Sequence, residues 1–308
     1  MTLKRLNLTY ALKDEIITHV SEVDRGLKCG CVCPACGERL IAKKGQKVTH
    51  HFAHQTTKDC DYGYESSLHL AAKEILSKAK KLVIPPVYVH FPNSYKEKLL
   101  LSDAKEITID RVELEQRFNN VVPDVVVYAE GKCLFIEVFV THCVDDEKLD
   151  KLRAADISTI EINLSKIDHS ITTEELVTIL TEDSEVKYWK YNARENKYLR
   201  KFYRISEKRN IISRGYAQQV DGCPIAARSW HGKPYANFID DCLYCQYCIA
   251  HSFEGGMLCS GRQRISSIKD FNIPEDVRIK ESIDALTAQR YNLLTKWICP
   301  NCGGQLIQ

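Results

Sequence analysis

The chain has 308 residues, of which 44% are hydrophobic and 27% are charged. This length suffices for about two globular domains, and this composition excludes an intrinsically disordered chain. No run reaches the roughly 18 apolar residues that a membrane-spanning helix needs. The first residues also lack the apolar core of a secretory signal. We therefore expect a cytoplasmic protein that has no membrane partner.

The formal net charge of +2 conceals an uneven distribution along the chain. Residues 1–60 carry 10 basic and 6 acidic side chains, and residues 61–185 carry 14 and 24. Residues 186–216 carry 10 and 2, and residues 217–308 carry 9 of each sign. All but two of the 14 cysteines lie before residue 61 or after residue 217. In chain order we therefore predict an N-terminal zinc-finger module, a central domain, a basic aromatic-rich helical bridge and a C-terminal cysteine-rich zinc module.

The sequence Cys-Pro-Ala-Cys-Gly at 33–37 is typical of a zinc knuckle, in which two thiolates hold one metal and the glycine permits a tight turn. His-His-Phe-Ala-His follows at 50–54. Clustered thiols in a reducing compartment favour metal ligands over disulfides. We expect one structural, four-coordinate zinc site with the ligands Cys33, Cys36, His51 and His54. The spacing leaves open His50 in place of His51, and Cys29, Cys31 or Cys60 as a further ligand.

A helical pattern begins after Tyr64, because apolar residues recur there at intervals of three or four. This apolar stripe consists of Leu68, Ala71, Ala72, Ile75, Leu76 and Ala79. Glu65, His69 and Lys73 follow one another every four residues, so they share one narrow strip of the same helix. A solvated row of ion pairs would have the same spacing.

Two β-branched runs follow at 121–128 and 134–140, and the short polar link between them predicts a β-hairpin. Each run contains one acidic residue among apolar neighbours, namely Asp124 and Glu137. A buried carboxylate is costly unless it is paired or bound to a cation. Two carboxylates on adjacent strands could chelate a hard cation such as Mg²⁺. The alternative is that each carboxylate caps a strand end or meets an arginine.

A charged helix at 145–155 and an alternating strand at 157–164 complete a mixed α/β (α+β) core. With this order of elements, the central domain resembles the PD-(D/E)XK nuclease superfamily, which has a mixed sheet flanked by helices. From Cys33 to about Ser165, the chain resembles the competence protein CoiA-like family. The motifs that carry this resemblance are Cys33/Cys36 with HHFAH, Glu65 to His69 through Lys73, Pro123-Asp124, Ile136-Glu137-Val138, and Val140-Thr141-His142 leading to Asp145 and Lys148.

The resemblance implies a Mg²⁺- or Mn²⁺-dependent nuclease that hydrolyses phosphodiester bonds, with DNA favoured over RNA. Such an enzyme would act in DNA processing or in defence against foreign DNA. Asp124 and Glu137 would hold the cation, and Glu65 would supply a further carboxylate. The chain departs from the motif two residues after Glu137, where Phe139 occupies the position of the lysine. The candidate catalytic residues are Glu65, His69, Lys73, Asp124, Glu137, His142 and Lys148, with Lys148 the first and Lys73 the second candidate to replace that lysine.

Residues 187–216 interleave basic and aromatic side chains, which respectively neutralise phosphates and stack on unpaired bases. The basic residues expected to contact nucleic acid are Lys187, Lys190, Arg194, Lys197, Arg200, Lys201 and Arg204. The alternative is a solvated helix whose aromatic residues pack on a neighbouring domain.

The C-terminal cysteines have the spacing of one or two further zinc sites. The expected ligands are Cys223, Cys242, Cys245, Cys248, Cys259, Cys299 and Cys302. The spacing does not choose between a ribbon that pairs both Cys-x2-Cys motifs and a site of Cys223, Cys242, Cys245 and Cys259. An iron–sulfur cluster is disfavoured because the ferredoxin spacing is missing. The alternative function is an inactive nuclease fold that binds nucleic acid, a protein partner or a second copy of this chain.

Overall fold

The computed structural model describes residues 8–56, 60, 62–91, 97–141, 146–168, 170–252 and 256–281. The chain divides into two compact units, one of Met1–Pro86 with Asp103–Ala193 and the other of Val87–Ser102 with Arg194–Gln308. Both units are therefore built from two separate stretches of sequence. Among the described residues, no helix is both long enough and apolar enough to cross a membrane.

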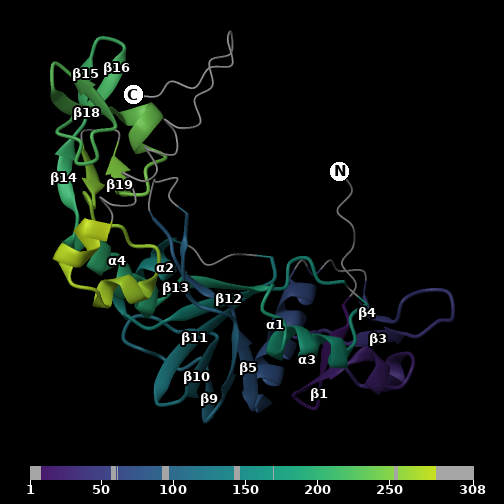
Figure 1. Ribbon diagram of the computed structural model, residues 1–308. Coiled ribbons are helices and arrows are strands. Elements are labelled where there is room, and N and C mark those ends of the chain that lie inside the picture. Colours follow the sequence, from purple (N-terminus) through teal and green to yellow (C-terminus); the bar gives the residue numbers. More distant parts are fainter. Residues whose placement is uncertain are drawn as a thin grey trace, which may run out of the picture. The chain divides into compact units, whose positions relative to one another are not determined.

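A five-stranded sheet lies at the centre of the first unit, in the order β13-β12-β11-β10-β9 (Figure 1). Its strands are β9 (Arg111–Leu114), β10 (Val125–Ala129), β11 (Lys132–Phe139), β12 (Thr159–Asn163) and β13 (Lys187–Tyr191). Strand β11 pairs antiparallel with β10 and parallel with β12. The mixed sheet expected from the sequence is confirmed.

Strands β10 and β11 form the expected hairpin. Glu130 and Gly131 connect them with φ values of 51° and 71°, and positive φ at both positions is what a two-residue hairpin turn requires. The first strand begins at Val125, later than the expected residue 121. Pro123 explains this delay, because proline has no amide hydrogen to donate to a neighbouring strand.

Helices cover both faces of this sheet, and the alternation of side chains along the strands explains why. Helix α1 (Gly63–Lys78) and helix α3 (Thr173–Thr181) bury their apolar stripes against one face, in a cluster that includes Leu68, Leu176 and Ile136. On the other face, Leu152 of helix α2 (Asp146–Ala154) packs with Phe135 and neighbouring residues. Successive residues of β11 thus point to opposite helical layers.

Three two-stranded sheets complete the described strands of the first unit. They are β1 (Tyr10–Lys13) with β2 (Ile16–His19), β3 (Leu40–Lys43) with β4 (His51–His54), and β5 (Lys81–Ile84) with β8 (Lys105–Thr108). The N-terminal residues have a small apolar core of their own, which contains Cys29, Cys31, Leu40 and Phe52.

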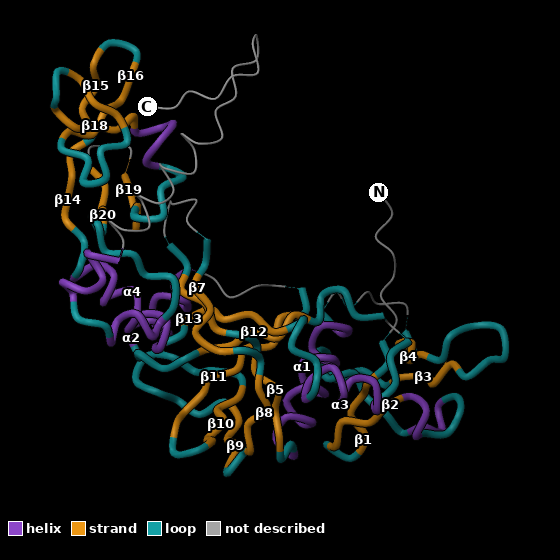
Figure 2. The backbone as a smooth tube through the Cα atoms, in the orientation of Figure 1, coloured by secondary structure: helices purple, strands orange, loops and turns teal. Residues whose placement is uncertain are grey.

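The second unit contains helix α4 (Ala193–Arg204, apart from its first residue) and nine strands among its described residues. A hairpin is formed by β6 (Val87–Val89) and β7 (Leu99–Ser102), and a three-stranded sheet by β14 (Glu207–Asn210), β20 (Gly256–Cys259) and β19 (Cys248–Ser252). A four-stranded sheet has the order β15 (Ile212–Arg214), β16 (Ala217–Asp221), β18 (Lys233–Asn237) and β17 (Arg228–Trp230). Figure 2 shows α4 in purple and strands such as β14, β16 and β18 in orange.

The basic segment is not one helical bridge, which corrects the expectation from composition. Residues Lys187–Tyr191 form edge strand β13, and only Ala193–Arg204 are helical. The aromatic residues of the Lys-Tyr-Trp-Lys-Tyr run favour a strand. Trp189 packs against the main apolar cluster, whereas Tyr188 is exposed. In this segment, alternate side chains thus face the apolar cluster and the opposite side of the sheet, as in a strand, although the basic charge is spread evenly along it.

Candidate active site and metal centre

Four ligand atoms converge where the knuckle, β4 and the residues before α1 meet. The thiols of Cys33, Cys36 and Cys60 and the ring of His54 have ligand atoms that all lie within 4.8 Å of one another. Gly37, with φ 72°, reverses the chain after the knuckle, and its amide donates to the carbonyl oxygen of Cys33 at 2.8 Å. This left-handed turn lets both knuckle thiols point to the same side.

The spacing of these atoms fits a zinc ion. The Sγ atoms of Cys33 and Cys60 are 3.9 Å apart, and Sγ of Cys36 is 3.4 Å from Nε2 of His54. Tetrahedral zinc with its usual bond lengths separates two sulfurs by about 3.8 Å, and a sulfur and a nitrogen by about 3.5 Å. A Cβ added to Gly63 would meet the Sγ atoms of Cys60 and Cys33 at 3.3 and 3.4 Å. The backbone at the start of α1 thus closes the site.

The structure replaces one ligand that the sequence predicts. His51 lies outside the cluster, and its Nδ1 is 2.8 Å from the carbonyl oxygen of Thr49. Cys60 takes its place, as one of the alternatives allowed. Cys29 and Cys31 are buried in the N-terminal apolar core, where the thiol of Cys29 donates to the carbonyl oxygen of Leu40 at 3.2 Å. His50 is not part of the cluster either.

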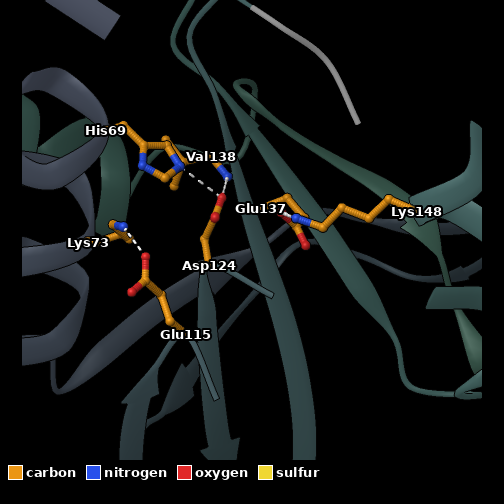
Figure 3. A network of polar contacts seen from close by, with 7 residues as sticks. All are labelled: His69, Lys73, Glu115, Asp124, Glu137, Val138 and Lys148. Carbon is orange, nitrogen blue, oxygen red and sulfur yellow. Dashed lines mark hydrogen bonds and ion pairs between the residues drawn. The ribbon is translucent and has the colours of Figure 1, made fainter. Parts of the chain in front are cut away.

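Five of the seven expected catalytic residues gather near the ends of β9, β10 and β11, namely His69, Lys73, Asp124, Glu137 and Lys148. Figure 3 shows His69 and Lys73 reaching from α1 toward the strands, with Asp124 next to Glu137 and Lys148 approaching from the other side. The carboxylate of Asp124 is 3.0 Å from Nε2 of His69 and accepts a hydrogen bond from the amide of Val138 at 2.8 Å. The Asp124 carboxylate therefore links the polar side of α1 to the β10–β11 hairpin.

The surroundings of Asp124 keep it ionised. Burial alone would raise its pKa, but the His69 ring, the Val138 amide and the Lys148 ammonium together lower the pKa below its usual value. Hydrogen bonds and positive charges favour the charged form of a carboxyl group. Asp124 thus remains an anionic carboxylate at the start of the β10–β11 hairpin.

Glu137 lies in the opposite situation. It is only 2% exposed, and burial, followed by the negative charge of Asp124, raises its pKa to about 8. Its Oε2 forms an ion pair with Lys148 Nζ at 2.6 Å. Its buried Oε1 has no hydrogen-bond partner among the described residues. A cation would stabilise this oxygen, so the donor set of Asp124 and Glu137 fits a hard divalent ion.

Both lysines proposed in place of the motif lysine lie on helices and form ion pairs with glutamates. Lys148 on α2 reaches Glu137, whereas Lys73 on α1 forms an ion pair with Glu115 at 2.7 Å. Glu115 follows β9, and its amide donates to the carbonyl oxygen of Asp124 at 3.2 Å. The two candidate lysines therefore lie on opposite sides of the carboxylates.

Two further candidates are placed less directly. Glu65 is half-buried in the first turn of α1, one turn before His69. His142 lies outside the described residues, as do Cys299 and Cys302.

Sequence reasoning missed a third carboxylate, Glu161 on β12. It pairs in register with Glu137, is 4% exposed and forms an ion pair with Lys190 Nζ at 2.9 Å. The alternation of residues 157–164 predicts only that Glu161 lies on the face of its strand opposite Ile160 and Ile162. Only the parallel register of β11 and β12 reveals that this face is also the face of Glu137.

The exposed face of α4 is basic. Arg194, Lys197, Arg200 and Arg204 are exposed, whereas Phe202 is buried against Phe91 and Phe271. The ammonium group of Lys201 lies 4.7 Å from the centre of the Tyr198 ring. These four exposed side chains can reach a phosphate backbone.

Lys187 and Lys190 are less exposed than these four residues, which corrects their expected role as contacts of nucleic acid. Lys187 is 2% exposed on β13 and donates to the carbonyl oxygen of Asp183. Lys190 is held by Glu161. Both lysines lie in the first unit, Lys187 in its interior and Lys190 half-buried in the ion pair with Glu161.

In the second unit, Cys223, Cys242, Cys245 and Cys259 line one small cavity of about 20 Å³. Cys248 is fully buried on β19, opposite Cys259, and does not line it. Burial raises the pKa of Cys242, and the neighbouring thiols of Cys245 and Cys223 raise it further. The Gly261 amide donates to Sγ of Cys259 at 3.4 Å.

Comparison with known proteins identifies one segment. Residues 19–63 match the family model described as competence protein CoiA, N-terminal domain. The match contains all four residues of the Cys/His cluster and ends at the first residue of α1. No curated protein and no solved structure matches the chain.

Proposed function

We propose that the chain is a competence-related nuclease that hydrolyses phosphodiester bonds of DNA with a divalent cation held by Asp124 and Glu137. The observation that carries this proposal is the buried Oε1 of Glu137, which has no hydrogen-bond partner among the described residues and lies beside the ionised Asp124. An unpaired buried carboxylate oxygen is costly and is retained where it has a ligand to bind. The match of residues 19–63 to a competence-protein family supports the same interpretation.

The residues of the chain would share the work as follows. His69 and the Val138 amide both contact Oδ2 of Asp124 and thereby fix the orientation of its carboxylate. Lys148 favours the ionised form of Glu137 and brings a positive charge to the site from α2. A bound Mg²⁺ or Mn²⁺ would polarise the scissile phosphate and lower the pKa of a water molecule. Lys148 would then stabilise the charge that develops on the phosphate.

Nucleic acid would also contact the exposed basic face of α4. Its arginines and lysine neutralise phosphates without reading the sequence. We assign this role to Arg194, Lys197, Arg200 and Arg204, and we leave out Lys187 because it is buried.

Zinc would stabilise both ends of the chain. The cluster of Cys33, Cys36, His54 and Cys60 would hold one ion, with no position left open for substrate. The four thiols around the cavity of the second unit would hold another. Unlike the first cluster, these thiols, all among the described residues, do not have three ligand atoms within 4.8 Å of one another, so an ion would have to draw them closer together.

A cleavage assay tests the catalytic proposal. The purified chain would be incubated with single-stranded DNA, double-stranded DNA and RNA in Mg²⁺, Mn²⁺ or EDTA. We expect cation-dependent cleavage that falls about 100-fold or more in Asp124→Asn, Glu137→Gln and Lys148→Met. Glu113→Gln is the matched control, since this acidic residue lies on the same sheet and contacts Arg111 and Tyr128.

Phe139 supports a second candidate, an inactive nuclease fold that only binds nucleic acid or a partner. Binding of DNA without cleavage of any substrate would establish that alternative. Full cleavage by Asp124→Asn or Glu137→Gln would instead refute the assigned site.

A further inference from the structure

Glu137 and Glu161 lie side by side on one face of the sheet. Strands β11 and β12 are parallel, and the two residues are partners in their register. Partners on neighbouring strands project to the same face and lie about 5 Å apart. Their neighbours Ile136, Val138 and Ile162 belong to the apolar cluster that contains α1, so both glutamates point to the other face.

Each of these glutamates is neutralised through one oxygen only. Lys148 Nζ lies 2.6 Å from Oε2 of Glu137, and Lys190 Nζ lies 2.9 Å from Oε1 of Glu161. The remaining oxygens, Oε1 of Glu137 and Oε2 of Glu161, are buried and have no hydrogen-bond partner among the described residues. Both side chains are at least nine-tenths buried.

A pair of structural ion pairs would not account for this arrangement. A lysine that served only to neutralise a buried glutamate would be expected to come with hydrogen bonds to the second oxygen, because that oxygen otherwise loses its water without compensation. Here two such oxygens lie on adjacent strands of one sheet. Oxygen atoms of carboxylates are the ligands that Mg²⁺ and Mn²⁺ prefer.

We propose that Glu137 and Glu161 form a second divalent-cation position, adjacent to that of Asp124 and Glu137, so that Glu137 bridges two ions. This inference rests on the proposed function for the first position. Pairs of ions in phosphodiester-cleaving sites lie about 3.5–4 Å apart, which a shared carboxylate and the spacing of neighbouring strands permit. Lys190 holds the Glu161 carboxylate in place and competes with the second ion for its charge.

The test counts ions rather than cleavage. The full-length, zinc-loaded chain would be titrated with Mn²⁺, with free Mn²⁺ followed by electron paramagnetic resonance. We expect two Mn²⁺ per chain in the wild type and in the control Glu113→Gln, and one in Glu161→Gln. Lys190→Gln should bind the second ion severalfold more tightly, because it removes the competing positive charge. Far-UV circular dichroism would verify that each variant is folded.

The outcomes separate the two proposals. A single Mn²⁺ in both the wild type and Glu161→Gln overturns the second position and leaves the proposed nuclease site intact. Two ions that persist in Glu161→Gln likewise overturn the assignment of Glu161. A wild type that binds no Mn²⁺ overturns both positions. The opposite effects of Glu161→Gln and Lys190→Gln are what a purely structural ion pair would not produce.

Discussion

Single residues decide what each site can bind, and Cys60 is the clearest case. It precedes α1 by three residues and completes the cluster that the sequence assigns to His51. The spacing left Cys60 open only as one of several further ligands, and it could not choose Cys60 over His51 because that choice depends on how the chain folds before α1. The ligand set is therefore a property of the tertiary fold rather than of motif spacing.

Cys60→Ser should remove one equivalent of bound zinc, whereas His51→Asn should remove none. A serine hydroxyl is a poor zinc ligand, and His51 is already engaged with the backbone of Thr49. Elemental analysis of the purified variants measures the ratio. Equal zinc loss in the two variants would show that the site needs His51 as well as Cys60, which would contradict this ligand set.

Lys187 makes the stability of the first unit depend on pH. Burial lowers its pKa to about 8, from an ordinary value of 10.5. Between these values the unfolded chain holds a proton that the folded chain has released, so the free energy of unfolding rises with pH through this window. Below pH 8 the lysine is protonated in both the folded and the unfolded chain, so it no longer makes the free energy of unfolding depend on pH.

Relative to Lys187→Met, the wild type should therefore gain about 2 kcal/mol of stability between pH 7.5 and pH 10. Urea unfolding of both proteins at the two pH values measures this difference. Subtracting the free energy of unfolding of Lys187→Met from that of the wild type cancels the contributions of titrating groups that both proteins share. A pH-independent difference between the two proteins would mean that Lys187 has an ordinary pKa.

At the scale of elements, helix α4 has one face that packs in the interior and one face that is exposed to solvent. Its apolar face holds Phe202 among other aromatic rings, and its basic face is exposed. Charge alone predicts that residues 187–216 contact nucleic acid, but burial restricts the exposed cations of this helix to Arg194, Lys197, Arg200 and Arg204. The role of the segment thus depends on which residues form β13 and which form α4.

Substituting these four residues with glutamine should weaken DNA binding and flatten its salt dependence. For double-stranded DNA, the slope of log K against log salt falls by about 0.9 for each phosphate that the protein no longer neutralises. Fluorescence anisotropy at several salt concentrations measures both quantities. Lys78→Gln with Lys81→Gln, two exposed lysines of the first unit, should leave the slope unchanged. An unchanged slope in the α4 variant would remove this helix from the DNA interface.

Periodicity in the sequence predicts most of the elements around the site. The apolar stripe of α1, the hairpin of β10 and β11, and the helix and strand that follow are all in place. The strip of Glu65, His69 and Lys73 correctly indicates the face of α1 that reaches the strands. Pairing between distant strands is not encoded in local periodicity, and for this reason Glu115 and Glu161 escaped sequence reasoning.

At the scale of the whole molecule, the chain passes from the first unit to the second and back before the second is completed. The β6–β7 hairpin belongs to the second unit although it lies between β5 and β8 in sequence. Its partners come much later in the chain, since the His90 amide donates to Glu195 Oε1 and Phe91 packs on Phe202. A cut after residue 193 would therefore leave the buried Phe91 without the Phe202 ring that covers it.

This interleaved arrangement sets an order of events during synthesis on the ribosome. The hairpin emerges about 105 residues before Glu195, the residue to which His90 binds. At elongation rates of about 5–20 residues per second, it waits roughly 5–20 s with its apolar side chains uncovered. During that interval a chaperone or a neighbouring nascent chain could occupy the place of α4. The time for which the hairpin waits without α4, as well as the stability of the finished second unit, would then affect the yield of folded protein.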